Sequence, residues 1–292
     1  STVVTAASAM ITPIIPPGLS MILYGSLASV SIGKIFVAGI GPGLLLCFVL
    51  MVLVYFISKR RNYETGNRSL KWGKGELWNA FKRAFLPLCL PIIIIGGIRI
   101  GIFTPTEAGA VSVIYALVLG FLYRELKLKH ILLGLRETVI TTSSIMFIVG
   151  AASAFAWVLT KEKIPQALMK YIVEVITNKH IFLIVINAFL LILGMFMEGN
   201  ASLIVLAPLL VPIARTFGIN DIQFALIFIF NIGIGCITPP LGTLMFVTCS
   251  ITKCKIQDFI KEATPFYIVA IICLILITYI PAFTLFFVNL IY

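Results

Sequence analysis

Histidine is scarce in this chain, and the motifs of common hydrolytic enzymes are missing. Only His130 and His180 occur in 292 residues, and both lie in predicted connections between apolar segments. The sequence contains neither an HExxH metalloprotease motif nor a Gly-x-Ser-x-Gly nucleophile elbow. These absences argue against an intramembrane enzyme, so we expect no catalytic residues.

Cysteine pairs and acidic side chains are also few. None of the six cysteines forms a CxxC pair and most lie in apolar segments, so we interpret them as buried structural thiols. Only 11 acidic residues oppose 22 basic ones, which gives a net charge of +11. The basic residues lie in the connections rather than in one groove. They therefore indicate membrane orientation and no nucleic-acid partner.

Long apolar segments make up most of the remaining sequence. Hydrophobic residues form 60% of the chain, more than soluble domains carry, so we predict an all-α polytopic membrane protein in a lipid bilayer. We divide the chain into residues 1–58, a first-repeat broken helix with the following span; 59–83, a cytoplasmic basic loop; 84–160, scaffold and connecting spans; and 161–292, a second repeat with a re-entrant hairpin, a broken helix and a last span.

The stretch from Met195 to Thr248 is central to this interpretation. Polar residues 198–202 interrupt an apolar segment and leave two limbs that we expect to be too short to cross a membrane alone, because a spanning helix needs about 20 apolar residues. This pattern predicts a re-entrant hairpin with Glu198 at its tip. Glycine, threonine and proline then break the span 222–250 near its middle and free backbone carbonyls. Hairpin tips beside broken helices form ion and substrate sites in secondary transporters.

A second copy of this break lies near the N-terminus. Pro16-Pro17 precedes Pro239-Pro240 by 239 − 16 = 223 residues, and the same offset places Pro42 on Pro265. Both copies run from a proline pair through an apolar half-helix and a short polar segment to another proline and an apolar span. We interpret this order as an internal repeat; the alternative is two unrelated kinked spans.

The segment from Lys59 to Arg83 sets the predicted orientation. It carries eight basic and two acidic residues, and short loops with this bias stay in the cytoplasm. Counting spans from there places Tyr292 in the periplasm and makes the two broken spans antiparallel, an inverted repeat. An anionic-lipid site is the alternative for this loop. The connection 161–180 fits the count poorly, because it falls outside although it has four basic and two acidic residues.

Glu198 is the acidic residue at the predicted hairpin tip. A carboxylate within a membrane is costly, so Glu198 is a candidate for binding a cation or a polar substrate; the alternative is a turn residue at the membrane surface. Asn200 and Ser202 add an amide and a hydroxyl, although Ser202 equally suits the N-cap of the second limb. Carbonyls freed around Gly235–Gly242 suit sodium, and the N-termini of the half-helices suit an anionic group.

Polar residues elsewhere in apolar segments have structural as well as functional explanations. Arg99 snorkels or pairs, or it faces a transported anion. Thr104 to Glu107 has the pattern of a capping box with Pro105 at N1, the alternative being a role for Glu107 near an ion. The hydroxyls of residues 141–144 bond back to the helix backbone or face the pathway.

Ordered motifs resemble the large membrane subunit of tripartite ATP-independent periplasmic (TRAP) transporters. They are IIPP at 14–17 with MILYG at 21–25, GIFTPTEA at 101–108, and ITPPLG at 237–242. The resemblance covers nearly the whole chain. It implies sodium-driven import of an organic acid across the bacterial inner membrane by an elevator mechanism, with no organic cofactor. It also implies a periplasmic substrate-binding protein and a small membrane subunit, separate or fused, as partners.

The same resemblance bears on individual residues. Glu198 falls where such proteins have an acidic hairpin-tip residue, whereas Gly18 departs from the serine expected after the proline pair, with Ser20 nearby to supply a hydroxyl. The candidate substrate-binding residues are Glu198, Asn200, Ser202, Ser20, Pro17 and Gly18. The candidate sodium-binding residues are Gly199, Asn200, Gly235, Thr238, Gly242, Thr243, Ile14 and Pro16.

Other functions and a longer polypeptide stay open at this point. A divalent-anion/sodium symporter that works without a binding protein shares hairpins and broken helices, and a purely structural membrane subunit is an alternative of a different class. The substrate is open among sialic acid, C4-dicarboxylates and keto acids. Because the first repeat begins at its broken helix with no hairpin before it, we expect the natural polypeptide to extend upstream of Ser1.

Overall fold

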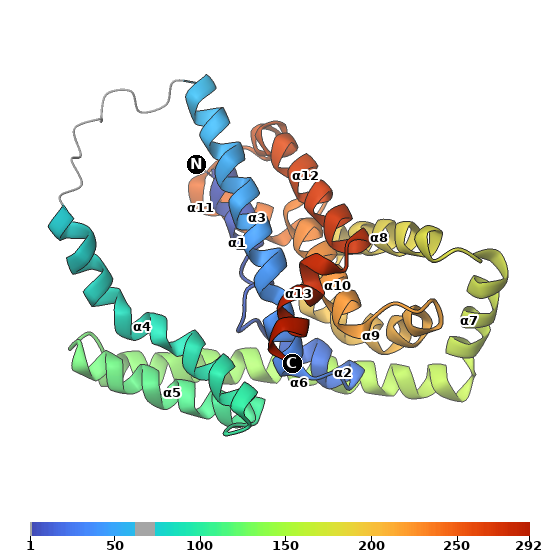
Figure 1. The fold of residues 1–292 in the computed structure, drawn as a ribbon, viewed down its shortest axis with the longest axis horizontal. Helices are drawn as coiled ribbons and strands as arrows, with labels where there is room; N and C mark the ends of the chain where they lie inside the picture. The colour runs from blue at the N-terminus through green and yellow to red at the C-terminus, as the bar shows by residue number, and fades with distance from the viewer. Residues whose placement is uncertain (1, 62–73) are drawn as a thin grey trace. The chain divides into compact units, whose positions relative to one another are not determined.

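The chain is helical throughout the part described by the structure, a computed structural model that covers residues 2–61 and 74–292 (Figure 1). No strand occurs in those ranges. The helices are α1 Thr2–Ala9, α2 Leu19–Ala28, α3 Ile32–Arg60, α4 Lys74–Ile100, α5 Pro105–Leu122, α6 Leu128–Lys161, α7 Ile164–Val175, α8 Lys179–Phe196, α9 Gly199–Thr216, α10 Asp221–Ile237, α11 Thr243–Thr252, α12 Ile256–Tyr279 and α13 Ala282–Ile291. Within the described residues, seven helices are long and apolar enough to cross a membrane, which confirms the predicted all-α polytopic membrane fold.

The helices form two compact units, residues 1–53 with 145–292, and residues 54–144. In the smaller unit α4 packs against α5, and the Tyr115 hydroxyl donates to the Leu86 carbonyl at 2.7 Å. The predicted capping box is present at the start of α5. The Thr104 hydroxyl accepts from the Glu107 N–H, and the Glu107 carboxylate accepts from the Thr104 N–H at 2.7 Å. The capping role predicted for Glu107 is therefore confirmed.

Several helix boundaries differ from the predicted ones. α3 and α12 each run unbroken through a proline, Pro42 and Pro265, because membrane helices tolerate proline where neighbouring groups satisfy the freed backbone. The last span, predicted as one segment, is interrupted near Pro281 and comprises α12 and the short α13. α4 begins inside the predicted basic loop 59–83, of which residues 62–73 lie outside the described residues.

The two proline-pair breaks are followed by equivalent helices. An offset of 243 − 19 = 224 residues places the first residue of α2 on that of α11 and the first residue of α3 on that of α12. α2 and α11 also end at residues with left-handed backbone, Ser29 at φ 55° and Lys253 at φ 54°. α1 packs against α11, and α2 packs against α10. The first half of each broken helix thus lies beside the second half of the other, and the inverted orientation of the two repeats stays a prediction.

The predicted hairpin consists of α8 and α9, with its tip at Met197 and Glu198. Each limb has 18 residues and is long and apolar enough for a span, so the limbs are longer than predicted and re-entry stays a prediction. α10 packs against α8, α9, α11 and α12, and its residues from Gln223 onward are almost all buried. α8 and α10 pack closely at Gly194 and Gly235. A Cβ on Gly235 would overlap the Gly194 carbonyl carbon, so this contact requires a residue without a side chain.

Candidate functional site

Two helices begin at the breaks behind glycine N-caps. Gly18 precedes α2 and Gly242 precedes α11, and neither supplies a side-chain cap. The first turn of each helix therefore keeps the positive end of its dipole without a capping oxygen from the N-cap side chain. Ser20 and Thr243 lie in these first turns, so each repeat brings one hydroxyl beside an uncapped helix N-terminus.

Glu198 caps the second limb of the hairpin. Its Oε2 accepts from the Ala201 N–H at 2.8 Å, which makes Glu198 the N-cap of α9. The alternative in which Ser202 is this cap was wrong, because Ser202 lies buried inside α9 and its hydroxyl donates to the Glu198 carbonyl at 3.0 Å. The N-terminus of α9 already has a carboxylate, unlike those of α2 and α11.

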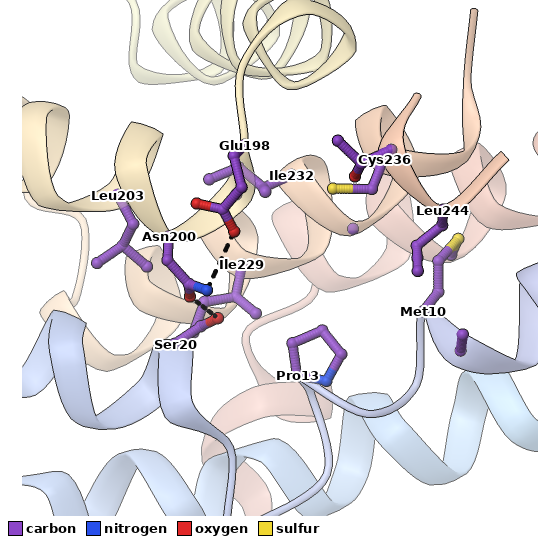
Figure 2. Close-up of a pocket in the computed structure, with 14 residues that line it drawn as sticks. Met10, Pro13, Ser20, Glu198, Asn200, Leu203, Ile229, Ile232, Cys236 and Leu244 are labelled. Atoms are coloured by element: carbon purple, nitrogen blue, oxygen red, sulfur yellow. Dashed lines mark hydrogen bonds between the residues drawn. The ribbon is translucent and has the colours of Figure 1, made fainter. Parts of the chain in front are cut away.

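A chain of hydrogen bonds joins the hairpin tip to the first break (Figure 2). The Ser20 hydroxyl donates to Asn200 Oδ1 at 3.0 Å, and Asn200 Nδ2 donates to Glu198 Oε1 at 3.1 Å. These contacts bring together residues that lie 180 positions apart in the sequence. Because an ionised carboxylate has about four acceptor positions, Glu198 retains the capacity to accept hydrogen bonds from a ligand or to bind a cation.

These residues line a cavity of about 220 Å³ that also contacts α1, α10 and α11. Its polar side chains are those of Ser20, Glu198, Asn200 and Thr243. None of the lining residues that the structure describes is lysine, arginine or histidine. An anion in this cavity would therefore depend on helix N-termini or on a bound cation to balance its charge. The remaining lining residues are Ala9, Met10, Pro13, Gly199, Leu203, Ile229, Ile232, Gly233, Cys236 and Leu244.

The predicted site residues divide into two groups. Those that line the cavity are Ser20, Glu198, Gly199, Asn200 and Thr243. Those that lie in the breaks, in α9 or in α10, outside the described lining, are Ile14, Pro16, Pro17, Gly18, Ser202, Gly235, Thr238 and Gly242. The structure therefore brings together the hydroxyl, amide and carboxylate groups of the prediction, and it leaves most of the predicted backbone positions behind the cavity wall.

Backbone carbonyls of the second break gather beside Gly242. A Cβ on Gly242 would lie 2.7 Å from the Thr238 carbonyl oxygen and 2.9 Å from the Cys236 carbonyl oxygen. The predicted Gly235 has a different role, because it packs against Gly194 and its carbonyl accepts from the Thr238 N–H at 3.0 Å. Carbonyls of an unwound helix are the ligands that bind sodium in transporters of this construction, so Cys236 joins Thr238 as a candidate.

Gly18 has a steric explanation. A Cβ at this position would lie 2.7 Å from the Pro13 carbonyl oxygen, closer than side-chain carbons approach backbone oxygens. A serine, expected here from the family resemblance, would need the first break to shift. Ser20, one position into α2, supplies the hydroxyl to Asn200 instead.

Sequence reasoning missed the apolar part of the wall. Met10 and Pro13 line the cavity because α1 packs against α11 and α12, a contact between residues more than 200 positions apart that no local pattern indicates. Cys236 is different, because it lies within the predicted break and its position next to Gly235 was a usable signal. It was assigned with the other cysteines as a structural thiol.

Comparisons with a family model and with individual relatives point to the same family. Residues 1–283 match the family described as tripartite ATP-independent periplasmic transporter, DctM component. The chain is 40% identical over 282 residues to the sialic acid TRAP transporter large permease protein SiaM of Vibrio cholerae, covering 96% of this chain and 65% of that protein. It is 40% identical over 274 residues to the C4-dicarboxylate TRAP transporter large permease protein DctM of Pseudomonas aeruginosa, covering 93% of this chain and 63% of that protein.

A third relative carries another substrate name. The 2,3-diketo-L-gulonate TRAP transporter large permease protein YiaN of Escherichia coli is 37% identical over 280 residues, which cover 94% of this chain and 64% of that protein. The chain thus spans slightly less than two thirds of the length of these relatives.

Proposed function

Because this chain belongs to the DctM component family of tripartite ATP-independent periplasmic transporters, a family of transporter components and not of enzymes, we propose that it forms the substrate-carrying part of an organic-acid importer. The proposed importer lies in the bacterial inner membrane and is driven by sodium. The proposed site is the cavity between the hairpin tip and the two breaks, lined by Glu198, Asn200 and Ser20.

The electrostatics of the cavity support an acidic substrate. Two uncapped helix N-termini, those of α2 and α11, reach it with Ser20 and Thr243 in their first turns. Helix N-termini attract carboxylates through their N–H groups and dipole. The equal 40% identity to relatives named for sialic acid and for C4-dicarboxylates supports the class organic acid and favours neither compound.

Sodium completes the charge balance of this site. Glu198 is acidic, the substrate carries at least one carboxylate, and the described lining has no cationic side chain. Bringing two carboxylates close together without a cation is unfavourable. The Glu198 carboxylate and the Cys236 and Thr238 carbonyls are oxygen ligands of the kind that sodium prefers, and they lie on the elements that surround the cavity.

The proposed mechanism is of the elevator type. Both breaks and the whole hairpin belong to the unit formed by residues 1–53 and 145–292, which supports movement of the site as one body. We propose a periplasmic substrate-binding protein that delivers the acid and a small membrane subunit, separate or fused, as partners. The C-terminus at Tyr292 faces the periplasm in this proposal.

The observation that supports this function most directly is the Ser20–Asn200–Glu198 chain of hydrogen bonds, because it joins the two repeats at one cavity. The test begins with a candidate periplasmic binding protein from the same organism, and a thermal-shift screen of organic acids identifies its ligand. Full-length permease in proteoliposomes should then take up that labelled acid only when the binding protein is present. Uptake that is equally fast without it would instead support a symporter that works alone.

A further inference from the structure

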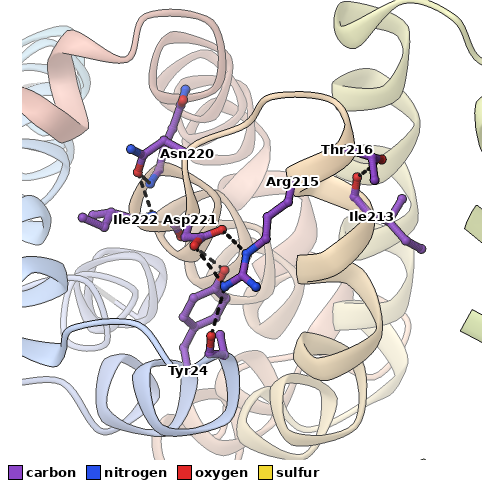
Figure 3. Close-up of polar contacts among 9 residues, drawn as sticks. Tyr24, Ile213, Arg215, Thr216, Asn220, Asp221 and Ile222 are labelled. Atoms are coloured by element: carbon purple, nitrogen blue, oxygen red, sulfur yellow. Dashed lines mark hydrogen bonds and ion pairs between the residues drawn. The ribbon is translucent and has the colours of Figure 1, made fainter. Parts of the chain in front are cut away.

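The short helix α2 is held at both of its ends by the hairpin limb α9. α2 packs along α9, and Ser20 near its start donates to Asn200 near the start of α9. Near its other end, Arg215 of α9 donates through Nη2 to the Ala28 carbonyl at 3.2 Å (Figure 3). An isolated helix of 10 residues has little stability of its own, so these contacts determine where α2 lies.

Arg215 is itself fixed by the residue that starts the next helix. Its Nε lies 2.9 Å from Asp221 Oδ1 and its Nη2 lies 3.0 Å from Asp221 Oδ2, a two-pronged contact that sets the plane of the guanidinium group. The Arg215 side chain is 49% exposed, and isolated surface ion pairs contribute little. Here the forked geometry matters more, because it leaves Nη2 aimed at the C-terminal carbonyls of α2, where a cation is also favoured by the helix dipole.

Tyr24 adds a second contact to the same end. Its ring is fully buried against Phe228, with ring centroids 6.4 Å apart, and its hydroxyl donates to the Asp221 carbonyl at 3.2 Å. Asp221 therefore contacts α2 from two sides, through Tyr24 directly and through Arg215. We name Tyr24, Arg215 and Asp221, together with the Ala28 carbonyl, the α2 clamp.

We propose that Arg215 is a positioning residue that acts through the α2 clamp to hold Ser20 against Asn200 in the site proposed above. α2 follows the break at Pro16–Gly18, and the described backbone hydrogen bonds include none between α1 and α2. Without the Arg215–Ala28 hydrogen bond, the Ser20–Asn200 bond is the one remaining hydrogen bond between α2 and α9 among the described contacts. The inference rests on the proposed function for its biological role, but the effect of Arg215 on the position of Ser20 can be measured without transport.

The test measures position and needs neither substrate nor sodium. In full-length permease with every native cysteine replaced, including the six of this chain, Ser20→Cys and Asn200→Cys are introduced together, and the rate of disulfide formation with copper phenanthroline is measured in membranes. With Arg215 present the pair should cross-link rapidly. Arg215→Gln should slow cross-linking about tenfold, the effect expected for loss of one charge-assisted hydrogen bond that positions the helix.

Two controls make the result specific. A cysteine pair at Asn187 and Thr278, which lie 3.2 Å apart on α8 and α12, should cross-link at the same rate with or without Arg215, which shows that the protein is folded. Lys170→Gln, which breaks an exposed ion pair with Glu174 away from α2, should change neither rate.

A second variant keeps the inference testable where Arg215→Gln fails to fold. Tyr24→Phe removes a single hydroxyl and should slow the Ser20–Asn200 cross-link about fivefold, as expected for one neutral hydrogen bond. A rate within twofold of the parent in folded Arg215→Gln, or in Tyr24→Phe if Arg215→Gln does not fold, would overturn the inference. A slowed cross-link would leave the inference standing even if the permease with its native Ser20 and Asn200 transported no organic acid, a result that would refute the proposed function.

Discussion

The Ser20 hydroxyl donates a hydrogen bond of 3.0 Å to Asn200 Oδ1, and this bond joins the first repeat to the hairpin tip of the second. We expect Ser20→Ala to raise the concentration of substrate-loaded binding protein needed for half-maximal uptake about fivefold, because it removes one neutral hydrogen bond that positions Asn200. Uptake into proteoliposomes at limiting substrate measures the effect.

The matched control for this change is Ser153→Ala. The Ser153 hydroxyl is exposed and donates only to the Val149 carbonyl of its own helix among the described contacts, at 2.7 Å. Its removal should leave the concentration dependence unchanged. Equal effects of the two substitutions would show that the Ser20 hydroxyl does not contribute to substrate binding by positioning Asn200.

The substitution Glu198→Gln tests whether this carboxylate binds sodium or substrate in addition to capping α9. Glu198→Gln keeps the size of the side chain and an acceptor for the Ala201 N–H, but it loses the charge. Charge-assisted hydrogen bonds contribute roughly 1.5–3 kcal/mol each. We therefore expect the apparent affinity for sodium, for substrate or for both to fall about 10- to 100-fold. Expression and folding should survive.

Glu107→Gln is the comparison, because Glu107 is also a carboxylate that caps a helix, with its oxygen 2.7 Å from the Thr104 N–H. Because glutamine also serves at N3 of a capping box, this change should leave apparent affinities unaltered. A Glu198→Gln permease that transports at the parent rate at limiting sodium and limiting substrate would reduce Glu198 to a cap.

Gly242 tests the carbonyl cluster of the second break. Gly242→Ala would bring a Cβ within 2.9 Å of both the Thr238 and Cys236 carbonyl oxygens and push them apart. We expect the half-saturating sodium concentration to rise about tenfold or more, since a shift of that kind costs on the order of 1.4 kcal/mol or more. Gly134→Ala, in a helix with open space at its Cβ, should change nothing. An unaltered sodium requirement in Gly242→Ala would exclude these carbonyls as ligands.

The membrane topology makes an independent prediction. We expect cysteines introduced into the basic segment 59–83 to react only with reagents that reach the cytoplasm, and a cysteine at Tyr292 to react from the periplasm, because basic loops stay inside and the span count is odd between them. Labelling of both positions from one side would contradict the orientation assigned to the two repeats.

The polar residues of the site could be predicted from the sequence, whereas most apolar residues that line the cavity could not. Glu198 and Asn200 stood out because polar groups inside apolar segments are costly, whereas Ser20 was named because the family resemblance implies a hydroxyl after the proline pair. The repeated proline pair indicated where the two breaks correspond. Met10 and Pro13 carry no such signal, and they reach the cavity only through the crossing of α1 with α11.

The helix ends show the same division between local and tertiary information. The capping box at Thr104 and Glu107 could be predicted because its hydrogen bonds depend on residues three positions apart. For α9 the sequence analysis considered only Ser202 as an N-cap, whereas in the structure Glu198 is the cap and accepts from the Ala201 N–H. The contact of Arg215 with the Ala28 carbonyl had no signal in the sequence, because it joins helices 187 positions apart.

The most direct test of the proposed function is uptake driven by a sodium gradient. Full-length permease with its small membrane subunit is reconstituted into proteoliposomes, and the binding protein is supplied outside with its labelled organic acid. We predict accumulation of the acid when sodium is higher outside, without ATP, and none when sodium is replaced by potassium or choline. Accumulation at the same rate in potassium or choline would contradict the assignment of this cavity as a sodium-coupled organic-acid site.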